Sequence, residues 1–251
     1  MNEPLFHALL ELADDSLILG QRLCEWSGHA PTVEVDLSLS NLALDLIGQA
    51  TLFLAYAGEV EGKGRDADRL AFHRDADQFH NCLLVEQPNG DFGQTMARQF
   101  LFSTYQLTLF DKLQHSTDRQ IAAISAKAVK EVTYHADLAA EWIIRLGDGT
   151  DESKARMVEG FDWFWRFVDD MFAAGEGQAD LIAACVLVDR ASLRAGFDSR
   201  VADVLALAEL HATPARLWPT IGGREGRHTE HLSALLALMQ VLPRAHPEAI
   251  W

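Results

Sequence analysis

Cysteine and basic residues are scarce in this chain of 251 residues, and each shortage excludes a class of structure or partner. The three cysteines, Cys24, Cys82 and Cys185, lie far apart and form no Cys-x-x-Cys pair, so we expect free thiols in a reducing compartment. The 21 basic residues face 37 acidic ones, a net charge of −16, which argues against binding to nucleic acid or to an anionic membrane.

Membrane segments and familiar catalytic motifs are missing as well. No apolar run approaches about 18 residues, so no membrane span is expected. The first residues, Met1-Asn2-Glu3-Pro4, have no basic stretch, so we expect no signal peptide, and a cytoplasmic location follows by elimination. The sequence contains no HExxH, Walker loop, GxSxG or GxGxxG motif.

Proline and glycine are few and clustered, and they mark the ends of long helical segments. Apolar residues make up 49% of the chain, which is enough for a large core, and nothing alternates in the manner of strands. Long helices joined by short links predict an all-α bundle, formed as a single domain over residues 1–251. The expected helices cover about 4–27, 33–58, 93–115, 118–146, 151–173, 190–208 and 224–241, with shorter ones in 68–86 and near 178–186.

Bundles that bind two metal ions use a Glu from each of two helices and a Glu-x-x-His pair from each of the other two. An acid stands three residues before a histidine at Glu225–His228 and at Asp77–His80, about as often as the composition alone predicts. Glu225 and His228 are therefore a weak ligand pair, and a polar patch at the start of the last helix is the simpler interpretation.

The segment 118–146 places His135 on an apolar stripe, with Glu131 one turn earlier. His135 is a ligand or a base in one interpretation and a hydrogen-bonded core histidine in the other, which we prefer. Tyr134 stands three residues after Glu131, where a metal-binding helix would carry histidine, and tyrosine is a poor ligand for divalent ions at neutral pH.

The segment 33–58 carries Asn41, Asp45 and Gln49 at a spacing of four, on one face of a helix. Asp45 is followed three residues later by Gly48 rather than by histidine. Neutral amides cannot balance two cations, so a polar seam inside the bundle, paired with lysines of a facing helix, is the better interpretation. The predicted polar core consists of Asn41, Gln49, Lys127, Lys130 and His135.

The segment 151–173 is rich in aromatic residues, which we expect in the core, with a subunit interface as the main alternative. These residues are Phe161, Trp163, Phe164, Trp165, Phe167 and Phe172.

Five stretches taken together resemble the PaaC family of subunits of the bacterial phenylacetyl-CoA epoxidase, along essentially the whole chain. They are residues 22–31, 41–50, 84–92, 124–131 and 228–232. The resemblance implies a ferritin-like fold and a structural subunit without a catalytic site, in a multicomponent oxygenase of phenylacetate breakdown. It also implies that the metal positions Asp45, Gly48, Glu131 and Tyr134 are degenerate and that this chain binds no metal or other cofactor.

The partners implied by the resemblance are a PaaA-like catalytic subunit that holds the di-iron site, a PaaB-like component, and a reductase that carries FAD and an iron–sulfur cluster. The complex would use O₂ and electrons from NADPH to epoxidise the ring of phenylacetyl-CoA. Contacts between copies of this chain stay open. Two alternatives also stay open: an independent di-iron or di-manganese oxidase that uses Glu131, His135, Glu225 and His228, and a helical scaffold of another complex.

A CoA-binding partner suggests one further contact, because helix N-termini with free amides bind phosphate. Two helix starts follow tight loops, and we consider both as places where this chain contacts substrate at a subunit interface. Capping of the helices by their own acids is the preferred alternative. The residues are Glu34, Val35, Asp36 and Leu37 at one start, and Gln178, Ala179 and Asp180 at the other.

Overall fold

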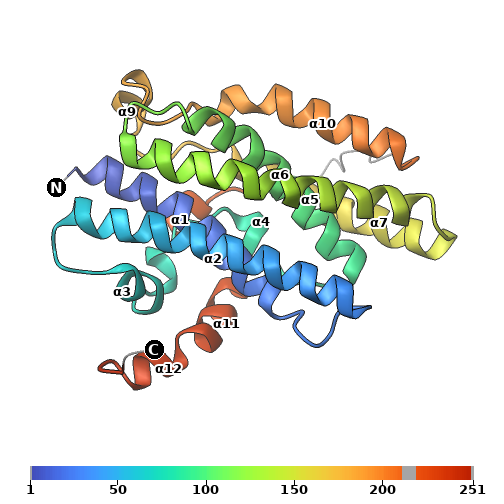
Figure 1. Ribbon diagram of the computed structural model, residues 1–251, viewed down its shortest axis with the longest axis horizontal. Helices are drawn as coiled ribbons and strands as arrows, with labels where there is room; N and C mark the ends of the chain where they lie inside the picture. The colour runs from blue at the N-terminus through green and yellow to red at the C-terminus, as the bar shows by residue number, and fades with distance from the viewer. Residues whose placement is uncertain (1, 211–218, 250–251) are drawn as a thin grey trace. The chain divides into compact units, whose positions relative to one another are not determined.

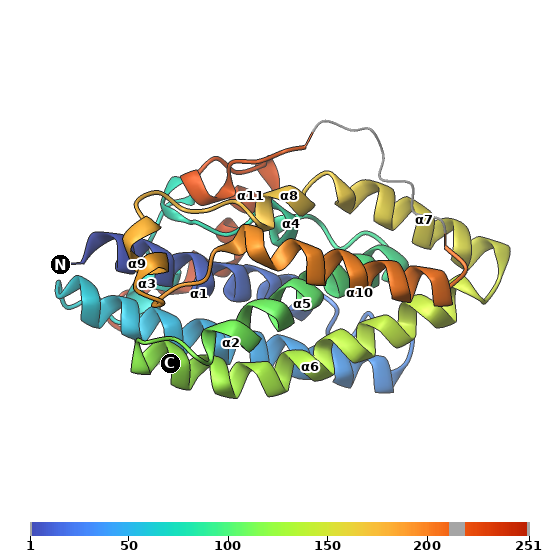
Figure 2. The same ribbon diagram turned by 90° about the horizontal axis from the view of Figure 1, so that it is seen from above.

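The computed structural model describes residues 2–210 and 219–249 (Figures 1 and 2). Within these ranges all regular structure is helical, as predicted, with twelve α-helices, three short 3₁₀ helices and no strand. The chain forms two compact units. Unit 1 is Met1–Pro88, Gly175–Leu181 and Gly222–Trp251, and unit 2 is Asn89–Ala174 and Ile182–Ile221. The single domain over residues 1–251 stays a prediction.

Unit 1 is built on two long helices, α1 and α2, which lie side by side in both views (Figures 1 and 2). Asn2 caps α1 by accepting a hydrogen bond from the Leu5 amide, and Thr32 caps α2 in the same way through Val35. The helices of this unit are α1 (Glu3–Cys24), α2 (Val33–Glu61), α3 (Ala67–Phe72), α4 (Leu83–Glu86), α11 (Glu230–Met239) and α12 (Val241–Ala245), while α9 (Ala179–Ala183) divides between the two units.

The helix α2 is apolar on more than one side. Leu39, Leu46 and Phe53 are buried, whereas Val33 and Leu44 are exposed. Among the described residues, α2 is the one helix long and apolar enough to cross a membrane by length and composition, with 44% of its most apolar window buried inside the protein. The helix passes this test without an unbroken apolar run, because mean hydropathy tolerates scattered polar residues, and the expectation of no membrane span is not contradicted. Core helices pass the same test, so the finding is weak evidence for a span.

Unit 2 contains the second pair of long helices, α5 and α6, which are joined by a short link and pack against each other. A capping box between Asp91 and Gln94 starts α5, and Asp118 caps α6 through the amides of Gln120 and Ile121. The helices of this unit are α5 (Phe92–Leu113), α6 (Arg119–Gly147), α7 (Asp151–Trp165), α8 (Val168–Met171) and α10 (Arg194–Leu207).

The aromatic segment is mostly core, as preferred from the sequence. Phe161, Phe164 and Phe167 are buried, whereas Trp163 is 40% exposed and holds the guanidinium of Arg166 over its ring at 4.4 Å. The expected continuous helix over 151–173 is wrong, since α7 ends at Trp165 and α8 begins at Val168. The carbonyl of Arg166 accepts from the Thr220 amide instead of from the next helical turn.

The last predicted helix, 224–241, is also divided. A 3₁₀ turn over Gly223–Glu225 ends at Gly226, whose φ of 73° lies in the left-handed region. A β-carbon at Gly226 would lie 2.4 Å from the carbonyl oxygen of Asp77, so this close approach requires glycine. The helix α11 starts only at Glu230.

Two glycines of α2 provide a matched test of this packing. A β-carbon at Gly48 meets nothing within 4 Å, whereas one at Gly58 would lie 2.1 Å from the carbonyl oxygen of Arg65. We expect Gly48→Ala to raise the free energy of unfolding by about 0.5–1 kcal/mol, because alanine restricts the unfolded chain. Gly58→Ala should lower it by about 1–3 kcal/mol, because the backbone must move apart. Urea titrations of both variants measure the difference, and equal changes would contradict the packing of α2 against residues 65–66.

Candidate functional site

Three acidic side chains of α1 lie inside unit 1. Glu11, Asp14 and Asp15 are 2%, 0% and 3% exposed, although ionised carboxylates are costly to remove from water. Each therefore requires partners, and these partners define the site.

Asp14 is neutralised by Arg74, which comes from the loop after α3. Arg74 Nη1 donates to Asp14 Oδ2 at 2.9 Å, and a second bond joins Nη2 to Oδ1. The amide of His80 also donates to Asp14 Oδ2 at 2.9 Å, and the Arg74 guanidinium covers the Phe79 ring at 4.1 Å. Such bidentate geometry is the strongest form of carboxylate recognition by arginine.

Asp15 is neutralised by Arg224, which precedes α11. Nη1 and Nη2 of Arg224 lie 2.9 Å and 2.8 Å from the two carboxylate oxygens, and the Cys82 amide donates to Asp15 Oδ1 at 2.7 Å. Glu11 accepts from Gln178 Nε2 at 2.8 Å. A β-carbon at Gly175 would lie 1.8 Å from Glu11 Oε1, so a larger residue there would have to displace the Glu11 side chain.

A fourth buried acid, Glu86 of α4, holds His228. Glu86 Oε2 lies 2.7 Å from His228 Nδ1, and the opposite ring nitrogen lies 2.9 Å from the carbonyl oxygen of Phe79. Carboxylates and carbonyls only accept, so both ring nitrogens donate and the ring is an imidazolium. Burial alone would lower the pKa of His228, but the hydrogen bond and the charge of Glu86 raise it above its ordinary value.

This arrangement is incompatible with Glu225 and His228 as a ligand pair. Both nitrogens of His228 are used within unit 1, and Glu225 is exposed and forms an ion pair with Arg227. Across residues 2–210 and 219–249, no group of three or more His, Cys, Asp or Glu side chains is arranged to hold a metal ion.

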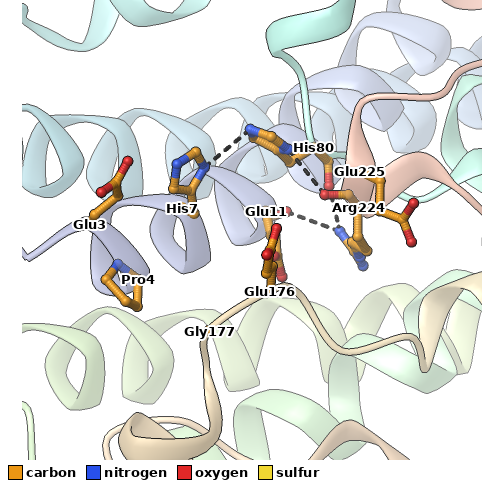
Figure 3. A pocket seen from close by; sticks show the side chains of 9 residues that line it. All are labelled: Glu3, Pro4, His7, Glu11, His80, Glu176, Gly177, Arg224 and Glu225. Atoms are coloured by element: carbon orange, nitrogen blue, oxygen red, sulfur yellow. Dashed lines mark hydrogen bonds between the residues drawn. The ribbon is translucent and has the colours of Figure 1, made fainter.

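A cavity of about 570 Å³ opens beside the buried acids (Figure 3). In Figure 3 His80 lies between His7 and Arg224, with His7 Nδ1 3.3 Å from His80 Nε2 and His80 Nδ1 3.1 Å from the Arg224 carbonyl oxygen. Burial lowers the pKa of His80, which favours the neutral ring. The lining consists of Glu3, Pro4, His7, Glu11, His80, Glu176, Gly177, Arg224 and Glu225.

The predicted polar seam of α2 is only partly buried. Asn41 is exposed, Asp45 and Gly48 are half-buried, and Gln49 is buried with its Oε1 3.4 Å from Ser16 Oγ. The placement of Asn41 in a polar core is therefore wrong. A step of four residues rotates the side chain by about 40° around an α-helix, so a polar row at this spacing winds from solvent into the interior.

The same rotation explains α6. Lys127 is exposed and lies 3.1 Å from Glu131, which is partly buried, and His135 is fully buried. Lys130 is exposed and Tyr134 is 49% exposed, so the two lysines are wrong as polar-core residues. Lysine side chains at these positions keep their charge in water, which avoids the cost of desolvation.

The two helix starts considered for CoA already have partners for several groups. Asp36 accepts from the Gly28 amide at 2.6 Å, and hydrogen bonds from its own backbone and from Thr32 lower the pKa of the exposed Glu34. Val35 is buried, and Leu37 is exposed. Gln178 is buried against Glu11, while Ala179 and Asp180 are exposed. The CoA contact stays a prediction.

Sequence reasoning missed the buried acids of α1. Their spacing of three and four residues places Glu11, Asp14 and Asp15 on one face of the helix, a pattern typical of a solvent-exposed stripe, so the sequence carried no signal that they are buried. The positions of Arg74 and Arg224, about 60 and 210 residues away, carried no local signal.

These features define an all-α protein in which two buried acids of α1 form ion pairs with arginines of the same chain. The comparison with known families agrees with this fold class. The chain belongs to the family of phenylacetic acid catabolic proteins, whose profile matches residues 1–251. It is 47% identical over 242 residues to the C subunit of the 1,2-phenylacetyl-CoA epoxidase of Escherichia coli (strain K12). The match covers 96% of this chain and 97% of that protein.

The imidazolium of His228 predicts a pH dependence. A histidine whose folded pKa is raised stabilises the fold fully below its unfolded pKa of about 6.5, and this stabilisation is lost as pH rises through the folded pKa. The stability advantage of the native chain over His228→Asn in urea unfolding should therefore be largest below about pH 6.5 and shrink as the pH rises above it. Replacement of the exposed His115 by asparagine is the control. A difference that stays constant with pH would contradict the Glu86–His228 pair.

Proposed function

We propose that this chain is the non-catalytic structural subunit of a phenylacetyl-CoA 1,2-epoxidase complex in aerobic phenylacetate catabolism, acting in the cytoplasm. It binds and supports a PaaA-like catalytic subunit that carries the di-iron site, beside a PaaB-like component and an NADPH-dependent reductase with FAD and an iron–sulfur cluster. The observation that carries the proposal is the identity of 47% along 97% of the C subunit of an epoxidase. Likeness along nearly the whole length supports a shared role in a complex.

The side chains at the positions expected for metal ligands support a structural role. Gly48 offers no donor atom, and Tyr134 extends partly into solvent where a Glu-x-x-His pair would place its imidazole. The acids of α1 are engaged by Arg74, Arg224 and Gln178. An independent oxidase would need Glu225 and His228, which do not form a ligand pair.

The surface of α2 supports binding to a helical partner. Four large apolar side chains, Val33, Leu37, Leu44 and Leu52, are 39–73% exposed on this one helix. Large apolar side chains exposed along one helix are a feature of surfaces that contact another protein. The charge of −16 disfavours self-association through polar surfaces, so an apolar face is the natural place for contact with another protein.

The double substitution Leu37→Asp and Leu44→Asp tests this interface. We expect the affinity for a PaaA-like subunit to fall at least about tenfold, because two carboxylates would be buried without partners. The melting temperature should change little, since both side chains are exposed. Leu207→Asp on α10, also exposed, is the matched control and should leave assembly unchanged. Unaltered affinity in the double variant would place the interface elsewhere.

The purified chain should contain no stoichiometric iron or manganese when it is produced in iron-rich medium. Elemental analysis of the chain alone, with the catalytic partner as positive control, measures the metal content. A content near two metal ions per chain, accompanied by turnover, would contradict the structural role and favour an independent oxidase.

A further inference from the structure

The polar side chains that line the cavity of unit 1 are mainly hydrogen-bond acceptors. Its single permanent cation, Arg224, is already engaged: Nη1 donates to Asp15 and to the carbonyl oxygen of His80, each at 2.9 Å, and Nη2 donates to Asp15 at 2.8 Å. This guanidinium balances a carboxylate outside the lining, so it does not neutralise the acids that face the cavity.

The histidine pair adds a further acceptor. The carbonyl oxygen of Arg224 can only accept, so His80 Nδ1 donates to it, and the neutral His80 ring then has its lone pair on Nε2. His7 Nδ1 donates to that lone pair, so Nε2 is the ring nitrogen of His7 that is left to accept from a ligand. In Figure 3 this second nitrogen is on the side of the ring toward Glu3.

The lining of the cavity also contains four carboxylates. Glu3 and Glu176 have no ion-pair partner within the described part of the chain, and both are exposed at the cavity. Glu225 forms an ion pair with Arg227, and Glu11 accepts a hydrogen bond from Gln178. A volume of about 570 Å³ accommodates a small organic molecule or the end of a long side chain.

We propose that this cavity binds an organic cation through a guanidinium or alkylammonium group, which donates to Glu3, Glu176 and the Nε2 lone pair of His7. Such groups have three to five donors and no acceptor, which complements a lining of acceptors. The cation comes either from a free polyamine or from a basic side chain of a partner protein. An anionic ligand such as a phosphate would meet two unneutralised carboxylates.

Agmatine, which joins a guanidinium to an ammonium, is the probe, and calorimetric titration of the full-length chain is the measurement. We expect saturable binding with a Kd below about 1 mM. The double variant Glu3→Gln and Glu176→Gln should weaken it at least about tenfold, because two charge-assisted hydrogen bonds become neutral. Glu59→Gln, an exposed acid of α2, is the control and should bind as the native chain does. 4-Guanidinobutyrate, which has a carboxylate in place of the ammonium, should bind more weakly.

Absence of saturable binding up to about 10 mM agmatine would overturn the proposal, and so would equal affinity in the native chain and the double variant. Circular dichroism of each variant ensures that lost binding does not reflect unfolding. A second titration, on the assembled complex, rests on the proposed function and separates the sources. Loss of agmatine binding on assembly identifies a side chain of a partner, and unchanged binding identifies a free cation.

Discussion

The neutralisation of the buried acids of α1 is the constraint on which unit 1 depends. An unpaired carboxylate in the interior costs several kcal/mol, a large part of a domain's total stability of about 5–15 kcal/mol. Asp14 and Asp15 therefore hold Arg74 and Arg224, and through them the segments before α4 and before α11. The buried carboxylate of Glu86 holds His228 in the same way, through a hydrogen bond to its imidazolium ring. Segments distant in the sequence are thus joined by charge as well as by apolar contact.

The ion pairs also determine the charge of the cavity at the surface of unit 1. Arg224 is engaged with Asp15, so the cavity beside it keeps the negative charge of Glu3 and Glu176. The exposed apolar side chains of α2, such as Val33 and Leu44, have no such internal role. Unit 1 therefore presents both an acidic cavity and exposed apolar side chains on α2.

The polar rows of α2 and α6 show where reasoning from spacing succeeds and where it ends. Spacing identified the rows, and Gln49 and His135 are buried as predicted. It placed Asn41 and Lys127 inside as well, and both are exposed. Side chains four residues apart are offset by about 40° around the helix axis, so one row crosses from solvent to core, and only the packing of neighbouring helices decides where the crossing occurs.

By itself, the sequence determined the all-α class and the position of most long helices, because caps, glycine and proline act over a few residues. Asn2, Thr32 and Asp118 start helices near where the pattern places them. Only the tertiary structure decided the breaks at Trp165 and Gly226, the ion pairs of α1 and the cavity beside them. Each of these depends on groups that meet across tens to hundreds of residues, and electrostatic pairing in a folded interior has no counterpart in local sequence periodicity.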